Sequence, residues 1–437
     1  MRKATRSRRS SARKSRRTSS GINRERVEAL LPRKRISTLA RATQFTQRQY
    51  RKVAPLAFLI TLVYGYGVET VRSMSSLQRF FTSITKIAMA RSAFQKKFSQ
   101  RSVAFFRRVF QESLALHAAQ LGTRLGGKLA RFRDVCAIDA TVIRLHDLLE
   151  KKYKATRTNH TKAAAKLHAV LSLSKRTISE MAISAERVGD REFLKTLKWL
   201  PGHLLLFDLG YYSHELFCAI HLQGGLFLSR LKDSAKPTIV RVRCGIARGQ
   251  RAKGKKLWDV EFAQGRPLDL DVCFGKGQPS FRLVGVFNSQ LNCWHLYVTN
   301  LPPGEFSPEE LATMYRLRWE VELLFKQLKG THRLEEFASI REDVVLTLLY
   351  AALLSLLAAR LLVCIVEQQD ERGARRLSLR IVSTYLAQHA LVLAAALLRG
   401  GRGVARHLAN IAEAIGLTCR DPNPHRPSVF ARIGTGT

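Results

Sequence analysis

The spacing of apolar residues changes twice along the chain, and this change constrains the fold more than any other feature. Apolar residues recur at helical spacing through residues 36–130, form short β-like runs through residues 132–300, and return to helical spacing after Phe306. A two-residue period buries one face of a strand, whereas a period near 3.6 buries one face of a helix. The chain is therefore expected to build a sheet from its middle part, with helical regions before and after it.

In the middle part, strand-like runs come first and then alternate with helical segments. The runs before residue 232 are VCAIDATVI, KLHAVLSL, TISEMAISA, HLLLFDLGYYS and GLFLSRLK, and the helical segments among them are EFLKTLKWL and SHELFCAIHL. This order is typical of an α/β core with a mixed sheet. Five further period-two segments, including KLWDVEF, lie between Gly-rich turns in residues 233–300 and predict a small β insertion. Its basic loop, residues 245–256, is suited to follow a phosphate chain.

The flanking regions are expected to be helical. Residues 36–130 mix aromatic with basic residues, which fits either a helix laid in a DNA groove or a plain bundle with a solvated charged face. In the C-terminal part we expect helices around 343–366 and 377–398, followed by a loose tail. The most apolar stretch, Val344 to Ala359, has 16 residues, fewer than the ~20 that span a bilayer. It is interpreted as a buried helix.

The charge of the chain points to a polyanionic partner. Lys and Arg number 74 against 33 Asp and Glu, a formal net charge of +41. Nucleic acids and anionic membranes attract such a chain, and the short apolar stretch favours nucleic acid. The basic, Ser-rich residues 1–35 are expected to form a flexible arm that binds phosphates, with a solubilising tail as the alternative. No secretory signal and no C-x-x-C pair are present, so a reducing compartment is expected.

One helix after Phe306 carries a line of polar residues. Ser307 and Glu310 predict a capping box at its start. At ~100° per residue, four polar side chains fall within a stripe about 60° wide, opposite the apolar face. These four are Tyr315, Arg318, Glu322 and Lys329. An ordinary amphipathic helix with solvated charges is the competing interpretation.

Two strand-like runs each contain a single acid, Asp139 in VCAIDATVI and Asp208 in LLLFDLGYY. A carboxylate there is costly unless it is exposed, paired or bound to a cation. A cap or a salt-bridged strand end is the alternative, above all for Asp208. Together with Glu322, the two acids make a site for hard cations such as Mg²⁺. Two such ions ~3.5–4 Å apart support phosphodiester chemistry, and the basic residues of the stripe would then hold phosphates.

Other polar residues compete for these roles. Asp134 and Asp147 flank the first strand, Asp269 and Asp271 are expected to face solvent, and Asp190 is interpreted as a helix cap. His168 lies in an apolar strand and is interpreted as a structural histidine. Arg230 and Lys232 end a strand near the expected site, where they are predicted to contact the DNA backbone.

The run YRLRWEVELLFKQLK reads Y-x2-R-x3-E-x6-K without a gap. It resembles the signature of the DDE transposases of the insertion sequence four family, and the segments around Asp139 and Asp208 resemble the same family. The resemblance covers roughly residues 36–365. It implies an RNase H-like core in which Asp139, Asp208 and Glu322 hold two Mg²⁺ ions, with Mn²⁺ as a substitute. Tyr315, Arg318 and Lys329 would contact phosphates near the transposon end.

The changes of spacing and charge along the chain, together with the resemblance over residues 36–365, predict six parts. The expected parts are a basic flexible arm (1–35), a helical DNA-binding region (36–130), the first part of the core (131–232), the β insertion (233–300), the second part of the core with the catalytic helix (301–370), and a helical C-terminal region and tail (371–437). Some members of the family hold a flipped base with aromatic residues. Trp258, Trp294 and Trp319 are candidates for this role, although a core role is expected for each.

The function expected from the resemblance is cut-and-paste transposition of DNA. The enzyme would cleave double-stranded DNA at the inverted-repeat ends of its element and join the strands to target DNA. It is expected to act as a homodimer in the synaptic complex, and no membrane partner is expected. A bacterial, nucleoid-associated protein of the cytoplasm is expected. A catalytically inactive DNA-binding protein derived from a transposase is the alternative, and a general RNA-binding protein is a weaker one.

Overall fold

The structure is a computed structural model that describes most of the chain. Residues 1–32 of the predicted arm and the end of the tail lie outside the described residues, and residues 33–35, predicted as part of the arm, begin a helix instead. The described residues are 33–47, 53–67, 73–121, 125–156, 161–195, 197, 201–263, 265–332, 334, 337, 339–369, 376–400 and 402–422. The chain divides into two compact units. The first comprises residues 1–122, 143–164 and 325–425, and the second comprises residues 123–142, 165–324 and 426–437.

The first unit is built from helices that come from both ends of the chain. The N-terminal ones are α2 (Arg33–Ala42), α3 (Pro55–Gly65), α4 (Met74–Thr85), α5 (Arg91–Gln95) and α6 (Gln100–Leu121), followed much later by α11 (Glu342–Gln369), α12 (Leu379–Gln388), α13 (Ala390–Arg399) and α14 (Arg402–Thr418). The helical prediction for residues 36–130 is thus confirmed where the structure describes them. The central helix α11 packs on α6 and α3, and a buried hydrogen bond joins Ser102 Oγ to Thr347 Oγ1 at 2.9 Å.

The C-terminal helices differ from the prediction in two ways. The expected helix 377–398 is broken at His389 into α12 and α13, which are bent by 72°. The expected loose tail contains α14, whose buried residues recur at helical spacing from Val404 to Ile415. The glycines just before α14 hid this pattern, because glycine is typical of loops rather than helix starts.

The most apolar stretch lies within α11, so the prediction of a buried helix is confirmed. Residues Glu342–Glu367 are long and apolar enough to cross a membrane, but 83% of their most apolar window is buried within the protein. Polar contacts join the start of this helix to other segments of the first unit. The Tyr153 hydroxyl donates a hydrogen bond to Glu342 Oε1 at 2.8 Å, and Arg341 Nη2 donates one to the carbonyl of Phe98 at 2.7 Å.

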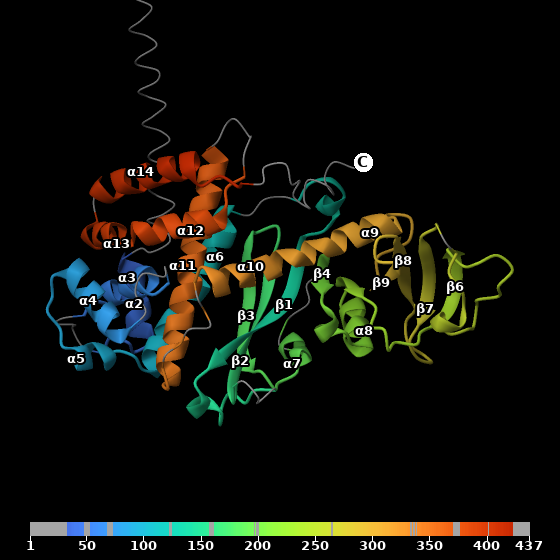
Figure 1. The fold of residues 1–437 in the computed structure, drawn as a ribbon, viewed down its shortest axis with the longest axis horizontal. Helices are drawn as coiled ribbons and strands as arrows, with labels where there is room; N and C mark the ends of the chain where they lie inside the picture. Colours follow the sequence, from blue (N-terminus) through green and yellow to red (C-terminus); the bar gives the residue numbers. More distant parts are fainter. Residues whose placement is uncertain are drawn as a thin grey trace, which may run out of the picture. The chain divides into compact units, whose positions relative to one another are not determined.

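The second unit is organised around a nine-stranded mixed sheet, which confirms the α/β prediction (Figure 1). The strands are β1 (Asp134–Leu145), β2 (Ala163–Ser172), β3 (Thr177–Ala185), β4 (His203–Phe207), β5 (Leu226–Arg230), β6 (Thr238–Cys244), β7 (Leu268–Cys273), β8 (Phe281–Asn288) and β9 (Cys293–Thr299). Their order is β3-β2-β1-β4-β5-β9-β8-β7-β6. Strands β1, β4 and β5 are parallel neighbours, whereas β2–β3 and the ladder from β5 through β9, β8 and β7 to β6 are antiparallel.

The predicted β insertion continues the same sheet, because β9 pairs with β5 through Arg230 and Tyr297. It contributes four strands instead of the five expected. The segment KLWDVEF forms a short 3-10 turn, η4 (Leu257–Asp259), and two isolated bridges, one at each end. Its residues Leu257 and Val260 join the apolar core without entering the strand ladder, which is why a period-two pattern misled the prediction.

Helices cover the two faces of this sheet. On one face, α7 (Asp190–Lys195) and α8 (His214–Leu222) bury Phe193 and Phe217 against apolar residues of β1, β4 and β5. On the other, α9 (Pro308–Tyr315) contacts β5, β8 and β9. Alternate residues of each strand therefore face different helices, so a single shift in register would exchange the faces.

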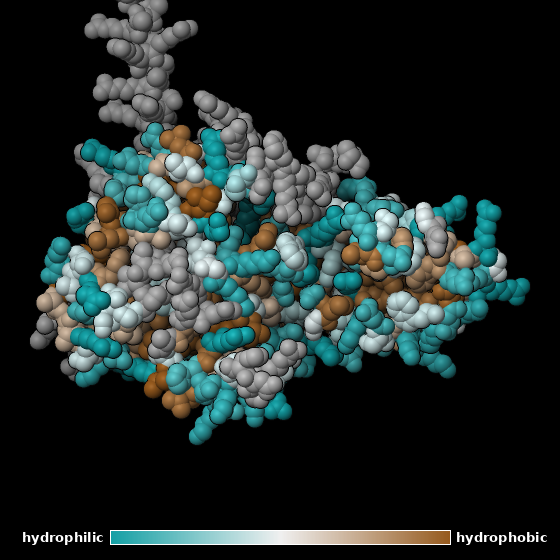
Figure 2. Space-filling view, in the orientation of Figure 1, coloured by the Kyte–Doolittle hydropathy of each residue, from teal (hydrophilic) through white to brown (hydrophobic). Residues whose placement is uncertain are grey.

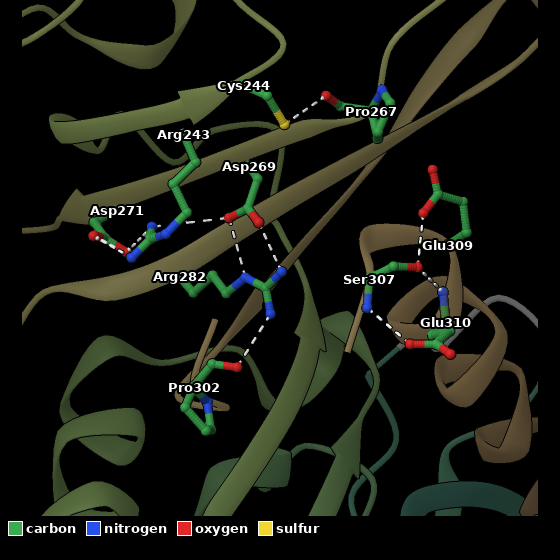
Figure 3. Close-up of polar contacts among 10 residues, drawn as sticks. All are labelled: Arg243, Cys244, Pro267, Asp269, Asp271, Arg282, Pro302, Ser307, Glu309 and Glu310. Atoms are coloured by element: carbon green, nitrogen blue, oxygen red, sulfur yellow. Dashed lines mark hydrogen bonds and ion pairs between the residues drawn. The ribbon is translucent and has the colours of Figure 1, made fainter. Parts of the chain in front are cut away.

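A ladder of charges crosses β6, β7 and β8, and it corrects one expectation. Asp269 does not face solvent: it is 7% exposed and pairs with Arg282 through two hydrogen bonds of 3.0 and 2.7 Å. Beside it, Asp271 pairs with Arg243 at 2.6 and 2.8 Å (Figure 3). Both acids need these partners because a buried, unpaired carboxylate is costly. On the face drawn in Figure 2, hydrophilic side chains gather over the β6 end of the sheet.

Candidate active site

The register of two parallel strands brings the lone acids together. Ile138 of β1 pairs with Phe207 of β4, and the next residue on each strand is one of the acids, Asp139 and Asp208. Both carboxylates thus stand at the carboxyl end of β4, where parallel strands leave room for polar groups. The Asp208 side chain is 45% exposed and that of Asp139 is 17% exposed.

The helix with the polar stripe starts as predicted but does not run straight. Ser307 and Glu310 form the expected capping box. The helix is then interrupted by a 3-10 turn, η5 (Arg316–Arg318), before α10 (Trp319–Gly330) begins. A 3-10 turn advances each residue by about 120° instead of ~100°, so the four polar residues do not form one regular stripe. Arg318 sits in the turn, and Glu322 lies in the first turn of α10.

Arg318 gathers the three acids around one guanidinium. Its Nη2 donates a 2.5 Å hydrogen bond to Glu322 Oε1. Its Nη1 lies 3.6 Å from Asp139 Oδ2, and its Nε lies 4.0 Å from Asp208 Oδ1. Three carboxylates that are far apart in sequence therefore converge within 4.0 Å of one side chain. Nε and Nη1 of Arg318 are buried without a hydrogen-bond partner among the described residues, so this guanidinium can donate to a further oxygen ligand.

The crowding of charges shifts two pKa values. Burial raises the pKa of Asp139 to about 6, and Asp208 and Glu322 add to the rise, against the hydrogen bond from the Ala140 amide and the charge of Arg318. Burial opposes the charge of Arg318, but Tyr315, Asp208 and Glu322 outweigh it and raise the pKa of the guanidinium. The site thus holds more negative charge than one arginine offsets, which favours an additional cation.

Tyr315 holds the end of β4 in place. Its hydroxyl donates a 2.9 Å hydrogen bond to the carbonyl of Phe207, the residue before Asp208. Burial raises the pKa of Tyr315 to about 12, so the hydroxyl stays protonated and remains a donor. A phosphate contact from this hydroxyl, as predicted, requires it to leave Phe207.

The other predicted phosphate contacts are spread over the chain. Lys329 lies in the last turn of α10, in the part of that helix that belongs to the first unit. Arg230 is the exposed last residue of β5, beside Tyr297 of β9. Lys232 is exposed two residues later, and its carbonyl accepts a 2.9 Å hydrogen bond from the Ala235 amide.

The sequence predicted only part of a polar network that includes His168 and Asp190. His168 is 1% exposed, and its two ring nitrogens contact the Tyr211 hydroxyl at 3.2 Å and Ser184 Oγ at 3.0 Å. This agrees with the structural role predicted for the histidine. Asp190 does more than begin a helix, because it forms a 2.7 Å ion pair with Lys166. A competing acid, Asp134, is 2% exposed and is hydrogen-bonded to the Ser172 hydroxyl and two backbone amides, which marks it as structural.

Sequence signals for this network exist in the FDLGYYS segment. A Cβ on Gly210 would lie 2.8 Å from Asp190 Oδ2, so only glycine fits between Asp208 and Tyr211 without a shift. Any larger residue at position 210 therefore requires the Asp190 side chain to shift, which disturbs its ion pair with Lys166.

The tryptophans do not all take the core role that was expected. Trp294 packs against Phe262 and Phe287 with ring centroids 5.4 Å apart in both pairs. Trp319, however, is 47% exposed and Trp258 is 45% exposed. Helical spacing already places Trp319 opposite the buried residues Val321 and Leu324, so its exposure follows from its position on the helix.

The acidic site contains the type of ligand atom that a divalent ion binds. Carboxylate oxygens are the ligands that Mg²⁺ and Mn²⁺ prefer, and three carboxylates gather here around one guanidinium. Within the described residues, no group of three or more His, Cys, Asp or Glu side chains is arranged to hold a metal ion. In this arrangement the guanidinium of Arg318 is the cation that separates the three carboxylates.

Most of this chain is similar to known proteins. Residues 130–358, just over half of the chain, match the family model described as Transposase DDE domain. The chain is 22% identical over 382 residues to the transposase for insertion sequence element IS1151 of Clostridium perfringens, covering 77% of this chain and 80% of the relative. It is 21% identical over 364 residues to the transposase for IS231E of Bacillus thuringiensis subsp. finitimus, covering 74% and 75%.

A solved structure of the piggyBac transposase synaptic complex with hairpin DNA aligns with 86% of this chain and 80% of its own, at 11% identity. Its TM-score of 0.47 is too low to establish a shared fold.

Proposed function

The chain belongs to the family of transposases with a DDE domain, and from this premise we propose how its acidic site acts. It is a DNA transposase of the insertion sequence type, an enzyme that cleaves DNA and transfers strands. We infer that it works by a cut-and-paste route, with cleavage at the inverted-repeat ends of its own element and joining to target DNA.

We assign an RNase H-like core to the second unit. The order β3-β2-β1-β4-β5, with β1, β4 and β5 parallel, supports this assignment. The positions of the acids support it too, because Asp139 lies on β1 and Asp208 directly follows β4. Strands β6–β9 are then the insertion that precedes the helix with Glu322.

The convergence of Asp139, Asp208 and Glu322 on Arg318 is the observation that carries the catalytic assignment. Membership of this family implies dependence on a divalent metal. We propose two Mg²⁺ ions held by the three carboxylates, with Mn²⁺ able to replace them. When bound, such ions activate the attacking oxygen and stabilise the leaving one in phosphodiester cleavage.

The other residues of the site are proposed to bind the DNA and to position the acids. Arg318 has two buried donors without a hydrogen-bond partner among the described residues, and a guanidinium pairs with two oxygens of a phosphate at once. We propose that it releases Glu322 and binds the phosphate that is cut. Tyr315 fixes the chain just before Asp208, and Lys329 contributes a positive charge toward the DNA.

The partners follow from the charge of the chain. We propose that helices α2–α6 and the basic arm of residues 1–35 bind the ends of the element, because this part of the chain is strongly basic. Two ends must be held together for transposition, so a homodimer is proposed for the synaptic complex. The bacterial cytoplasm, in association with the nucleoid, remains the proposed location.

Replacement of Glu322 by Gln tests the assignment, because it removes one carboxylate and keeps the size of the side chain. A labelled duplex with the terminal inverted repeat of the element should still be bound. Its Mg²⁺-dependent cleavage should fall roughly a thousandfold, as the loss of ~4 kcal/mol of transition-state stabilisation predicts. Glu320→Gln, two residues earlier on the same helix, is the matched control and should cleave normally.

Two outcomes would contradict parts of this proposal. Cleavage by the Glu322→Gln variant at the wild-type rate would remove Glu322 from the catalytic set. End binding by the wild-type protein without any Mg²⁺- or Mn²⁺-dependent cleavage would instead favour an inactive DNA-binding protein derived from a transposase.

A further inference from the structure

Two arginines from different elements lie near His295 and Tyr297, on the face of the sheet that α9 covers. Arg230, the last residue of β5, lies directly opposite Tyr297 of β9. Arg316 opens the turn η5, immediately after Tyr315, whose ring centroid lies 5.1 Å from that of Tyr297. Directly opposed residues of an antiparallel pair point to the same face. Both arginines are exposed.

The groups between these arginines are neutral. Arg230 Nη2 lies 3.5 Å from His295 Nδ1, and the Asn288 amide lies 3.3 Å from the other ring nitrogen. Burial lowers the pKa of His295, and the charges of both Arg230 and Arg316 lower it further. Arg230 thus contacts this imidazole directly, and the charges of both guanidiniums disfavour its protonated form.

No carboxylate offsets these two charges within the described residues. Neither arginine forms an ion pair there, whereas the two arginines of the neighbouring strands do. Arg243 pairs with Asp271 and Arg282 with Asp269, as Figure 3 shows. Like charges that share a neighbourhood repel each other unless an anion lies between them. Arg243 and Arg282 thus have carboxylate partners, whereas Arg230 and Arg316 have none among the described residues.

We propose that Arg230, His295, Tyr297 and Arg316, here termed the paired-arginine site, bind one backbone phosphate of DNA next to the phosphate that is cut. The inference rests on the proposed function and extends it, because Arg316, His295 and Tyr297 lie outside the Y-R-E-K pattern. Guanidiniums present rigid forks of donors that match phosphate oxygens. The neutral imidazole and phenol line the site without competing for the anion.

The position of Tyr315 connects this site to the acids. Its ring packs on Tyr297, and its hydroxyl binds the carbonyl of Phe207, which precedes Asp208. One tyrosine therefore separates the paired-arginine site from the carboxylates. A DNA strand bound both at the paired-arginine site and at the carboxylates cannot slide along the protein. The paired-arginine site therefore helps to decide which phosphodiester bond reaches the carboxylates.

Salt titration of end binding tests the proposal, with the metal chelated so that cleavage plays no part. The probe is a duplex with the terminal inverted repeat of the element. Arg316→Gln and Arg230→Gln should each weaken binding about 5- to 20-fold and lower the salt slope by roughly 0.9, the value for one phosphate contact. Arg316→Lys should restore the slope. Arg266→Gln, which removes an exposed arginine of the same unit, should leave the binding affinity and the salt slope unchanged.

Neutral methylphosphonate substitutions then identify the phosphate. At one position of the probe, a methylphosphonate should weaken binding by the wild-type protein. The same methylphosphonate should not weaken binding by the Arg316→Gln variant any further, because that variant has already lost the contact. The proposal is overturned if Arg316→Gln has the affinity and salt slope of Arg266→Gln, or if every methylphosphonate costs both proteins equally. A wild-type protein that does not bind the probe at all would refute the proposed function instead.

Discussion

The raised pKa of Asp139 predicts that the active site costs the protein stability at neutral pH. The pKa lies near 3.8 in an unfolded chain and is raised to about 6 in the folded protein, chiefly by burial. The folded state therefore holds the proton more tightly. The stability that this proton provides is fully present below about pH 4 and is lost as the pH rises through about 6.

The magnitude follows from the size of the shift. About two pKa units at ~1.4 kcal/mol each give roughly 3 kcal/mol. This conversion is reasonable because the side chain is only 17% exposed. Asp139→Asn removes the charge and keeps the shape. Its free energy of unfolding should therefore rise, relative to that of the wild-type protein, by up to about 3 kcal/mol between about pH 4 and pH 7.5.

Urea unfolding in a chelating buffer at several pH values measures this difference. Asp233→Asn, which removes an exposed carboxylate of the same unit, is the control for a lost surface charge. Mg²⁺ added at about pH 7.5 should stabilise the wild-type protein, by ~2.7 kcal/mol at a hundred times the dissociation constant, and should stabilise Asp139→Asn far less. A difference between Asp139→Asn and wild type that stays flat from about pH 4 to 7.5 would refute the reasoning.

Two further substitutions test the packing that supports the site. Gly210→Ala places a Cβ 2.8 Å from Asp190 Oδ2 and should destabilise the fold by ~1–3 kcal/mol. In a double-mutant cycle with Asp190→Ala most of this cost should vanish, and additive unfolding free energies would exclude the contact. Arg282→Met leaves Asp269 buried without its partner and should cost ~3–5 kcal/mol in thermal or urea unfolding. A cost similar to that of Arg266→Gln would show that the buried pair contributes little.

Local sequence patterns predicted the elements well because the forces behind them act over a few residues. The capping box at Ser307 and Glu310, the strands that lead to Asp139 and Asp208, and the buried character of α11 were all read from spacing and residue type. The same patterns failed where a contact partner lies far away in sequence. KLWDVEF alternates like a strand but packs as a turn, and glycines concealed α14.

By itself, the sequence singled out the candidate side chains for the chemistry, because lone acids in apolar strands and a line of polar residues on one helix are costly without a function. It also determined the polyanionic partner through the net charge. Only the tertiary structure decided that the register of β1 and β4 sets Asp139 beside Asp208, and that η5 turns Arg318 among three carboxylates. It alone brought Arg230 and Arg316 to one imidazole. Such neighbours depend on sheet order and strand register, which are set by packing between segments that are distant along the chain.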